Sequence, residues 1–255
     1  KQGQDLFDVT TSVLLGMREV SARLKPDVIL VHGDTTTAFA AATAGFYSNI
    51  PIGHVEAGLR TNDLSAPFPE EFNRQVISKI TRWHFAPTIS GQKNLIREGI
   101  DPSSVIVTGN TVIDALRWVL GRIEADNSRR AALDIHWGSL LPFDWRVERF
   151  VLITGHRREN FGDGFLQICA AIHTLALKYP EIHFVYPVHL NPQVQEPVRR
   201  LLGRADNIHL IEPLDYLPFV YMMKQSRVIL TDSGGIQEEA PSLGKPVLVM
   251  RDTTE

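Results

Sequence analysis

The stretch Pro26-Asp27-Val28-Ile29-Leu30-Val31-His32-Gly33-Asp34-Thr35 decides the fold of this chain. Its apolar, β-branched run at residues 28–31 lies between a proline and a glycine, which predicts a buried strand that ends at Gly33. The alanine-rich residues 36–47 that follow predict a helix packed closely on the sheet. A strand that leads directly into a helix is the unit of a parallel α/β sheet. Asp34 therefore falls just past the carboxyl end of a strand, where open α/β sheets bind their ligands.

Strands and helices alternate in this way along most of the chain. Outward from this stretch, further strands are predicted at residues 52–55, 84–86, 105–107, 150–154, 183–188, 208–211, 228–231 and 247–250. Further helices are predicted at residues 5–24, 70–80, 90–98, 111–123, 165–178, 194–202, 216–225 and 236–243. The expected fold class is α/β, with parallel sheets and helices on both faces. Residues 121–148 break the alternation, so we expect them to connect a Rossmann-like domain at residues 1–120 to a second one at residues 149–255.

The composition excludes several classes of protein. A hydrophobic fraction of 44% and a charged fraction of 22% are typical of a soluble globular protein. The net charge is −3 and no basic block occurs, which argues against nucleic-acid binding. No apolar run approaches the roughly 20 residues of a membrane span. The single cysteine, Cys169, cannot form an intramolecular disulfide and suits a cytoplasmic location, and we interpret it as a small core residue.

Acidic residues follow the strands and helix starts of the first half. Glu56 comes after the second strand, in His54-Val55-Glu56-Ala57-Gly58, and Glu70 and Glu71 open the helix after Pro69. Neighbouring carboxylates can act as general acids, general bases or stabilisers of a cation. Asp34 and Glu70 also have a purely structural interpretation, because acids are common at helix starts. Glu56 lacks that alternative, since Ala57-Gly58 is no clear helix start.

The second half carries a glycine turn between a strand and a helix. In Asp232-Ser233-Gly234-Gly235 the paired glycines allow close approach of a ligand, and the helix N-terminus attracts phosphate. Glu239, one turn into that helix, can accept hydrogen bonds from a ribose. The alternative is an ordinary capped strand-to-helix turn.

Four further residues follow strands or lie near the start of a helix in the second half. His156 and Arg157 follow the strand at residues 150–154 and can hold a diphosphate, although charged residues there can also form solvated surface pairs. His189 can contact the substrate or a second ligand, or only pack within its loop. Phe219 can stack on a base, although an aromatic residue at helical spacing is more often part of the core.

The sequence argues against a metal or a cofactor. Its nine histidines show neither HxxxH nor HExxH spacing, and Cys169 has no cysteine partner, so no ligand set for zinc is visible. Neither a GxGxxG fingerprint nor a GxxxxGK[ST] loop occurs, which disfavours NAD and ATP. We therefore expect no metal and no cofactor.

Five motifs together resemble those of the bacterial non-hydrolysing UDP-N-acetylglucosamine 2-epimerases. They occur in order along the chain: His32-Gly33-Asp34-Thr35, His54-Val55-Glu56-Ala57-Gly58-Leu59-Arg60, Pro69-Glu70-Glu71-Phe72-Asn73-Arg74, Gly155-His156-Arg157-Arg158-Glu159-Asn160 and Asp232-Ser233-Gly234-Gly235-Ile236-Gln237-Glu238-Glu239. The resemblance implies two Rossmann-like domains of the glycosyltransferase-B type, with UDP bound by the second. It also implies a cytoplasmic homodimer of cell-surface polysaccharide biosynthesis. The family opens with a strand and a Gly-Thr-Arg-Pro-Glu turn and closes with returning helices, so we expect both ends to be missing here.

The resemblance also implies a reaction, the reversible conversion of UDP-GlcNAc to UDP-ManNAc. UDP leaves C1, 2-acetamidoglucal forms, and UDP adds back after C2 is protonated from the other face. The implied catalytic residues are Asp34, Glu56, Glu70 and His156. The implied substrate-binding residues are Arg74, Arg157, Phe219, Ser233, Gly234, Gly235 and Glu239, and His189 and Arg157 are implied for a second, activating UDP-GlcNAc. Two alternatives stay open: a 2-epimerase for a related UDP-diacetamido-uronic acid, and a UDP-sugar-binding fragment without catalysis.

Overall fold

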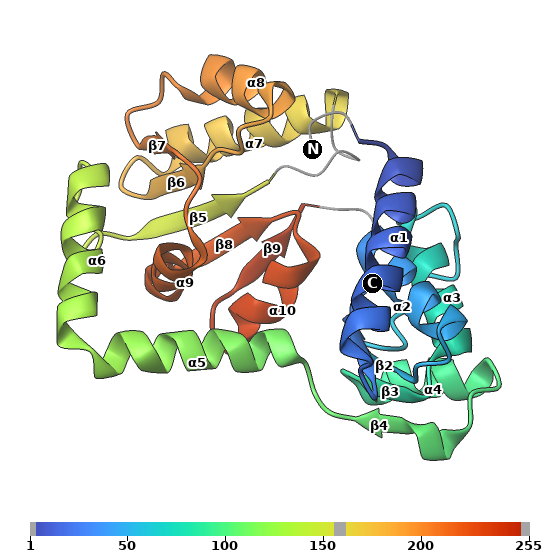
Figure 1. Ribbon diagram of the computed structural model, residues 1–255. Coiled ribbons are helices and arrows are strands. Elements are labelled where there is room, and N and C mark those ends of the chain that lie inside the picture. The colour runs from blue at the N-terminus through green and yellow to red at the C-terminus, as the bar shows by residue number, and fades with distance from the viewer. Residues whose placement is uncertain (1–3, 156–161, 251–255) are drawn as a thin grey trace. The chain divides into compact units, whose positions relative to one another are not determined.

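The computed structural model describes residues 4–155 and 162–250, and every structural statement below refers to these residues. The chain divides into two compact units, Lys1–Thr111 and Val112–Thr254, each built around a parallel sheet (Figure 1). The sequence placed the end of the first domain at residue 120, whereas the units divide at the start of a helix, between Thr111 and Val112.

Unit 1 contains four parallel strands in the order β1-β2-β3-β4. The strands are β1 (Ile29–His32), β2 (Ile52–Val55), β3 (Trp83–Ala86) and β4 (Val105–Val107). The helices are α1 (Leu6–Leu24), α2 (Thr36–Tyr47), α3 (Glu70–Ile80) and α4 (Ile89–Arg97), with a 3₁₀ turn η1 (Pro102–Ser104) before β4. Register pairs His32 with Val55, so the residues that follow β1 and β2 leave the sheet at the same edge.

Small residues allow α2 to lie close to the sheet of unit 1. Ala38 and Ala42 pack with Ile29, Val31 and Ile52 in one core cluster. A Cβ at Gly45 would lie 2.4 Å from Cδ1 of Ile52, so a larger side chain would force either the buried Ile52 side chain or the helix to shift. On the other face of β1, Leu30 is 63% exposed, so this strand is buried on one face rather than throughout as its apolar run indicated.

Unit 2 contains five parallel strands in the order β7-β6-β5-β8-β9. The strands are β5 (Phe150–Thr154), β6 (His183–Pro187), β7 (Ile208–Ile211), β8 (Val228–Thr231) and β9 (Val247–Val249). The helices are α5 (Thr111–Ala125), α6 (Asn127–Leu140), α7 (Asp163–Lys178), α8 (Pro192–Leu202), α9 (Tyr216–Gln225) and α10 (Gly234–Ser242). The chain builds outward from β5 to β7 and then crosses to β8 on the other side of β5. Such a reversal creates a topological switch point, here at the ends of β5 and β8.

Helices cover both faces of the unit 2 sheet, as expected for this fold class. One core cluster contains residues of α7 and α8, including Phe165 and Val194, and a second contains residues of α5, α6, α9 and α10. The second cluster includes Leu133, Trp137 and Trp145, all at most 6% exposed. Residues 121–148, which the sequence indicated as a connection, therefore contribute to the core of unit 2. The α/β class with parallel sheets is confirmed.

Candidate active site

Asp34 and Glu56 lie at the same edge of the unit 1 sheet. Each follows the carboxyl end of its strand, and the N–H of Gly33 donates to the carbonyl of Val55 at 3.0 Å, which holds the two strand ends together. Gly33 has a φ of 71°, a conformation that favours glycine. A Cβ at this position would lie 3.7 Å from Oε1 of Glu56. The turn after β1 thus brings Asp34 and Glu56 to one edge.

Asp34 is held by two consecutive residues of α3. The Arg74 guanidinium donates a charge-assisted hydrogen bond to the Asp34 carboxylate, and the Asn73 amide donates to the Asp34 carbonyl at 2.8 Å. Arg74 is only 2% exposed. The alternative that Asp34 caps the next helix is wrong, because Thr35 is the N-cap and accepts from the Ala38 N–H at 3.3 Å. The Asp34 side chain is instead committed to Arg74.

Glu56 adopts a left-handed backbone with a φ of 69°. Such a conformation is unfavourable for a residue with a side chain and is frequent at functional sites. Its Oε2 atom lies 3.2 Å from Nε2 of His32, at the end of β1. His32 is therefore a third residue at this edge, and the sequence interpretation gave it no role.

The adjacent acids Glu70 and Glu71 have opposite environments. Glu70 is the first residue of α3 and is partly exposed, whereas Glu71 is completely buried. The Glu71 carboxylate accepts from the backbone N–H groups of Thr61 and Asn62 at 3.0 and 3.1 Å, and it lies 3.6 Å from the Arg74 guanidinium. Sequence reasoning treated Glu71 as helix-start composition. The available signal was the helical spacing of Glu71, Arg74 and Ser78, all of which are buried.

A buried histidine on β2 holds the turn at the same sheet edge. His54 on β2 is fully buried and donates from Nε2 to the carbonyl of Gly33 at 2.8 Å. Burial lowers the pKa of His54 to about 4, so the ring is neutral at pH 7. A neutral ring can hold the Gly33 turn without adding a positive charge beside the acids.

The switch point of unit 2 brings together the ends of β5 and β8. The Thr154 hydroxyl donates to Oγ1 of Thr231 at 2.6 Å, and that oxygen accepts from the Ser233 N–H at 3.0 Å. A Cβ at Gly155 would lie 3.7 Å from Oδ2 of the buried Asp232. The backbone of the Ser-Gly-Gly turn is thus fixed by hydroxyl groups of the two central strands.

Helix α10 begins at Gly234 immediately after this turn. Ser233 occupies the N-cap position, but its side chain makes no capping hydrogen bond, so the capped-turn alternative describes only its backbone. The helix N-terminus carries a partial positive charge and unpaired N–H donors that suit an anion. Gly235 is exposed, and the nearest atom to a Cβ there would be Oγ of Ser233 at 4.0 Å.

Glu239 links α10 to α9. It is 6% exposed and accepts from the Tyr216 hydroxyl at 3.1 Å, and burial raises its pKa above the ordinary value. Phe219, one turn along α9 from Tyr216, is half-buried and packs against the core cluster of this face. The sequence contained no signal for the contact of Tyr216 with Glu239, because the two residues are 23 positions apart.

Three predicted residues remain. His156 and Arg157 lie outside the described residues. His189 is exposed, and its Nδ1 accepts from the N–H of Asn191, the N-cap of α8, at 3.1 Å. This contact fits the loop-packing interpretation of His189.

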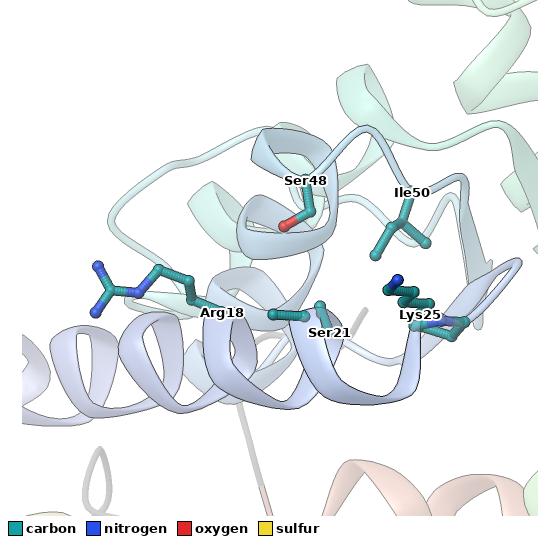
Figure 2. A pocket seen from close by; sticks show the side chains of 7 residues that line it. Arg18, Ser21, Lys25, Ser48 and Ile50 are labelled. Carbon is teal, nitrogen blue, oxygen red and sulfur yellow. The ribbon is translucent and has the colours of Figure 1, made fainter.

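Other features of the described chain lie apart from these edges. No group of three or more His, Cys, Asp or Glu residues within the described ranges is placed to hold a metal ion. Within the same ranges, none of the helices has the length and apolarity needed to cross a bilayer. A cavity of about 400 Å³ lies beside the C-terminal part of α1 and the residues after α2 (Figure 2). Its lining includes Arg18, Lys25 and Ser48, which places it at the ends of the helices that precede β1 and β2, away from Asp34 and Glu56.

The fold and these edges define an α/β protein of two Rossmann-like units, with carboxylates at the strand ends of one and a glycine turn at the switch point of the other. The family model described as UDP-N-acetylglucosamine 2-epimerase matches residues 1–255. The chain belongs to this family, as its motifs indicated.

Relatives and solved structures agree with this assignment. The chain is 57% identical over 255 residues to a probable UDP-N-acetylglucosamine 2-epimerase of Ralstonia nicotianae, covering all of this chain and 67% of that protein. It is 53% identical over 253 residues to the UDP-N-acetylglucosamine 2-epimerase of Escherichia coli K12, covering 99% of this chain and 66% of that protein. The chain thus spans about two thirds of the length of these relatives.

The crystal structure of UDP-GlcNAc 2-epimerase from Neisseria meningitidis bound to UDP-GlcNAc is 51% identical, with a TM-score of 0.93 over 100% of this chain and 67% of that one. The S. aureus MnaA–UDP structure is 44% identical, with a TM-score of 0.89 over 98% of this chain and 65% of that one. The chain shares only its fold with an α,α-trehalose 6-phosphate synthase from Burkholderia multivorans. The two are 14% identical, with a TM-score of 0.55 over 98% of this chain and 62% of that one.

Proposed function

We propose that the protein catalyses the reversible epimerisation of UDP-GlcNAc to UDP-ManNAc at C2, by elimination and re-addition of UDP. The observation that carries this proposal is the pair of carboxylates, Asp34 and Glu56, which the register of β1 and β2 brings to one sheet edge. Membership of the family and the UDP-GlcNAc bound to the Neisseria meningitidis relative support it.

The chemistry explains why acids are needed in unit 1. The C2 proton lies next to no carbonyl, so its direct removal would be very costly. If the C1–O bond breaks as the C2 proton leaves, the electron pair of the C–H bond forms the C1–C2 double bond of 2-acetamidoglucal and UDP departs. Asp34, Glu56 and Glu70 stabilise the oxocarbenium-like C1 and exchange the C2 proton. Return of a proton to the opposite face and re-addition of UDP gives the epimer.

In this proposal, residues of unit 2 bind the nucleotide part of the substrate. Ser233, Gly234 and Gly235 bind phosphate at the N-terminus of α10. Glu239 binds the ribose and Phe219 stacks on the uracil, while His156 and Arg157 hold the departing diphosphate. No step requires a metal or a redox cofactor.

We extend the proposal to the assembly and the regulation of the protein. It acts as a cytoplasmic homodimer in cell-surface polysaccharide biosynthesis, and a second UDP-GlcNAc activates it through His189 and Arg157. The family resemblance supports these features. Light scattering of the purified protein tests the dimer, and a rate curve that stays sigmoidal and unchanged in His189→Ala contradicts the effector role of His189.

Deuterium incorporation tests the proposed reaction. Full-length protein incubated with UDP-GlcNAc in D₂O should place deuterium at C2 and form UDP-ManNAc, and Glu56→Gln should abolish both. Glu238→Gln is the matched control, because Glu238 is exposed on α10 and has no part in the proposed chemistry.

Two results would indicate one of the alternative functions. Calorimetric binding of UDP without any exchange at C2 would indicate a binding module. Faster turnover of a UDP-diacetamido-uronic acid would indicate the related epimerase.

A further inference from the structure

The buried face of α3 is unusual because it is largely polar. Glu71 and Ser78 are completely buried, and Arg74 is 2% exposed. Charged side chains are rarely buried unless they are paired, and an unpaired charge in such a place is strongly unfavourable. The arrangement of this face therefore depends on the contacts that its charges make.

We propose that Glu71 is a positioning residue that orients the carboxylate of Asp34 through Arg74. Arg74 lies between the two acids: its NH2 group donates to Asp34, and its NH1 group lies 3.6 Å from Oε2 of Glu71. The planar guanidinium presents its donors in a rigid fork, so a partner on one side restricts the direction of the other side. At 3.6 Å the contact is an ion pair rather than a hydrogen bond, so Glu71 acts on the direction of the Arg74 donor through its charge.

Glu71 is itself fixed by contacts from two segments. Its oxygens accept from the backbone N–H groups of Thr61 and Asn62, and Oε1 accepts from the Gln75 amide at 2.7 Å. Hydrogen bonds to an ionised acceptor are stronger than neutral ones. The carboxylate therefore ties the loop that follows β2 to α3, and it holds the guanidinium from a position that it cannot easily leave.

Asp34 is the member of this chain of contacts that faces the proposed chemistry. It is partly exposed, whereas Arg74 and Glu71 are buried behind it. This inference rests on the proposed function, because Asp34 matters to catalysis only if the acids act on the sugar. A displacement of about 1 Å in a catalytic group can reduce the rate by roughly 100-fold.

Glu71→Gln is the critical variant, because glutamine keeps the shape and one oxygen acceptor but removes the charge. In the full-length protein we expect kcat to fall about 100-fold while KM stays within about threefold, since binding of the nucleotide belongs to unit 2. Glu71→Asp, which keeps the charge, should recover part of the lost kcat. A purely structural residue would lower Tm without this effect on kcat in protein that remains folded.

Glu98→Gln provides the matched control. Glu98 pairs with Arg60 through bonds of 2.7 and 2.9 Å, and the Arg60 side chain is almost completely buried. Arg60 also donates to Oγ of Ser78 at 2.9 Å, so this is a second ion pair against α3, but one that does not contact Asp34. Loss of the Glu98–Arg60 ion pair in Glu98→Gln should lower Tm but leave kcat within about twofold of the parent value. An unchanged kcat in folded Glu71→Gln, or an equal fall in kcat in Glu98→Gln, would overturn the positioning role while leaving the proposed function intact.

A crystal structure of Glu71→Gln tests the inference without any activity. The Arg74 guanidinium should turn away from its place on Asp34, and an unchanged pair would overturn the proposal. A parent protein that forms no UDP-ManNAc would instead refute the proposed function, and the crystal structure would still decide whether Glu71 orients Arg74.

Discussion

Gly58 offers a direct test of how the loop after Glu56 is built. Its φ is 94°, and a Cβ there would lie 2.2 Å from the carbonyl oxygen and 2.7 Å from the carbonyl carbon of Gly91. Both contacts are with backbone at the start of α4, so no side-chain rotation can relieve them. The Gly58 carbonyl also accepts from the Asn94 amide at 3.0 Å. Gly58→Ala must therefore displace either the loop or α4.

The expected destabilisation has separable parts. The positive φ costs an alanine about 1–2 kcal/mol, and overpacking costs about 1–3 kcal/mol. The lower entropy of the unfolded alanine chain offsets about 0.4–1 kcal/mol, which leaves a loss of about 1–4.6 kcal/mol. Gly99→Ala isolates the first part, because Gly99 has a φ of 84° and no atom within 4 Å of its Cβ position. Gly121 on α5 has neither constraint, so Gly121→Ala should stabilise its helix by about 0.5–1 kcal/mol.

Hydrogen exchange measured by mass spectrometry resolves these effects by unit. In Gly58→Ala, amides of β2 and β3 should exchange about 5- to 2,000-fold faster, because each 1.4 kcal/mol changes the open population tenfold. Peptides of β5 and β8 should be unchanged. Gly99→Ala should raise exchange by less than about tenfold. Equal effects of Gly58→Ala and Gly99→Ala would refute the reasoning that contact with Gly91 dominates.

Three further predictions concern buried groups. Cys169 is fully buried, and burial raises its pKa to about 11. DTNB should therefore label the Cys169 thiol of native protein at least about 100-fold more slowly than that of unfolded protein, and comparable labelling rates would contradict this packing. Burial lowers the pKa of His54 from 6.5 to about 4, so as the pH falls the unfolded state binds a proton before the folded state does. The free energy of unfolding should therefore fall by up to about 3 kcal/mol between pH 6.5 and pH 4. Denaturant unfolding should show a weaker pH dependence for His54→Asn than for the parent, and identical pH dependence would exclude His54 as the cause. Tyr216→Phe removes the donor to Glu239 and should cost about 1 kcal/mol at pH 7, measured by the denaturation midpoint. The matched variant Tyr221→Phe instead removes a hydroxyl bonded to Asp134. A loss that persists in a Glu239→Leu background, which has no side-chain acceptor, would show that the Glu239 contact is not responsible.

Much of the fold could be read from local pattern. Strands such as β1 and β8 differ from their predicted bounds by at most one residue, because short apolar runs bounded by turn residues depend little on the rest of the chain. The boundary between the two units was harder to predict from the sequence. Residues 121–148 lack the strand–helix rhythm, yet Trp137 and Trp145 are buried, since a core position depends on which surfaces the helix meets. Sequence periodicity does not report such partners.

The placement of acids after strands was determined by the sequence alone, because a parallel sheet brings successive carboxyl ends to one edge. The roles of individual acids were decided by tertiary structure. Glu70 and Glu71 are neighbours with the same chemistry, but Glu71 alone meets Thr61, Asn62 and Arg74. Burying a carboxylate requires donors, and these donors come from a loop and a helix turn that only folding brings together.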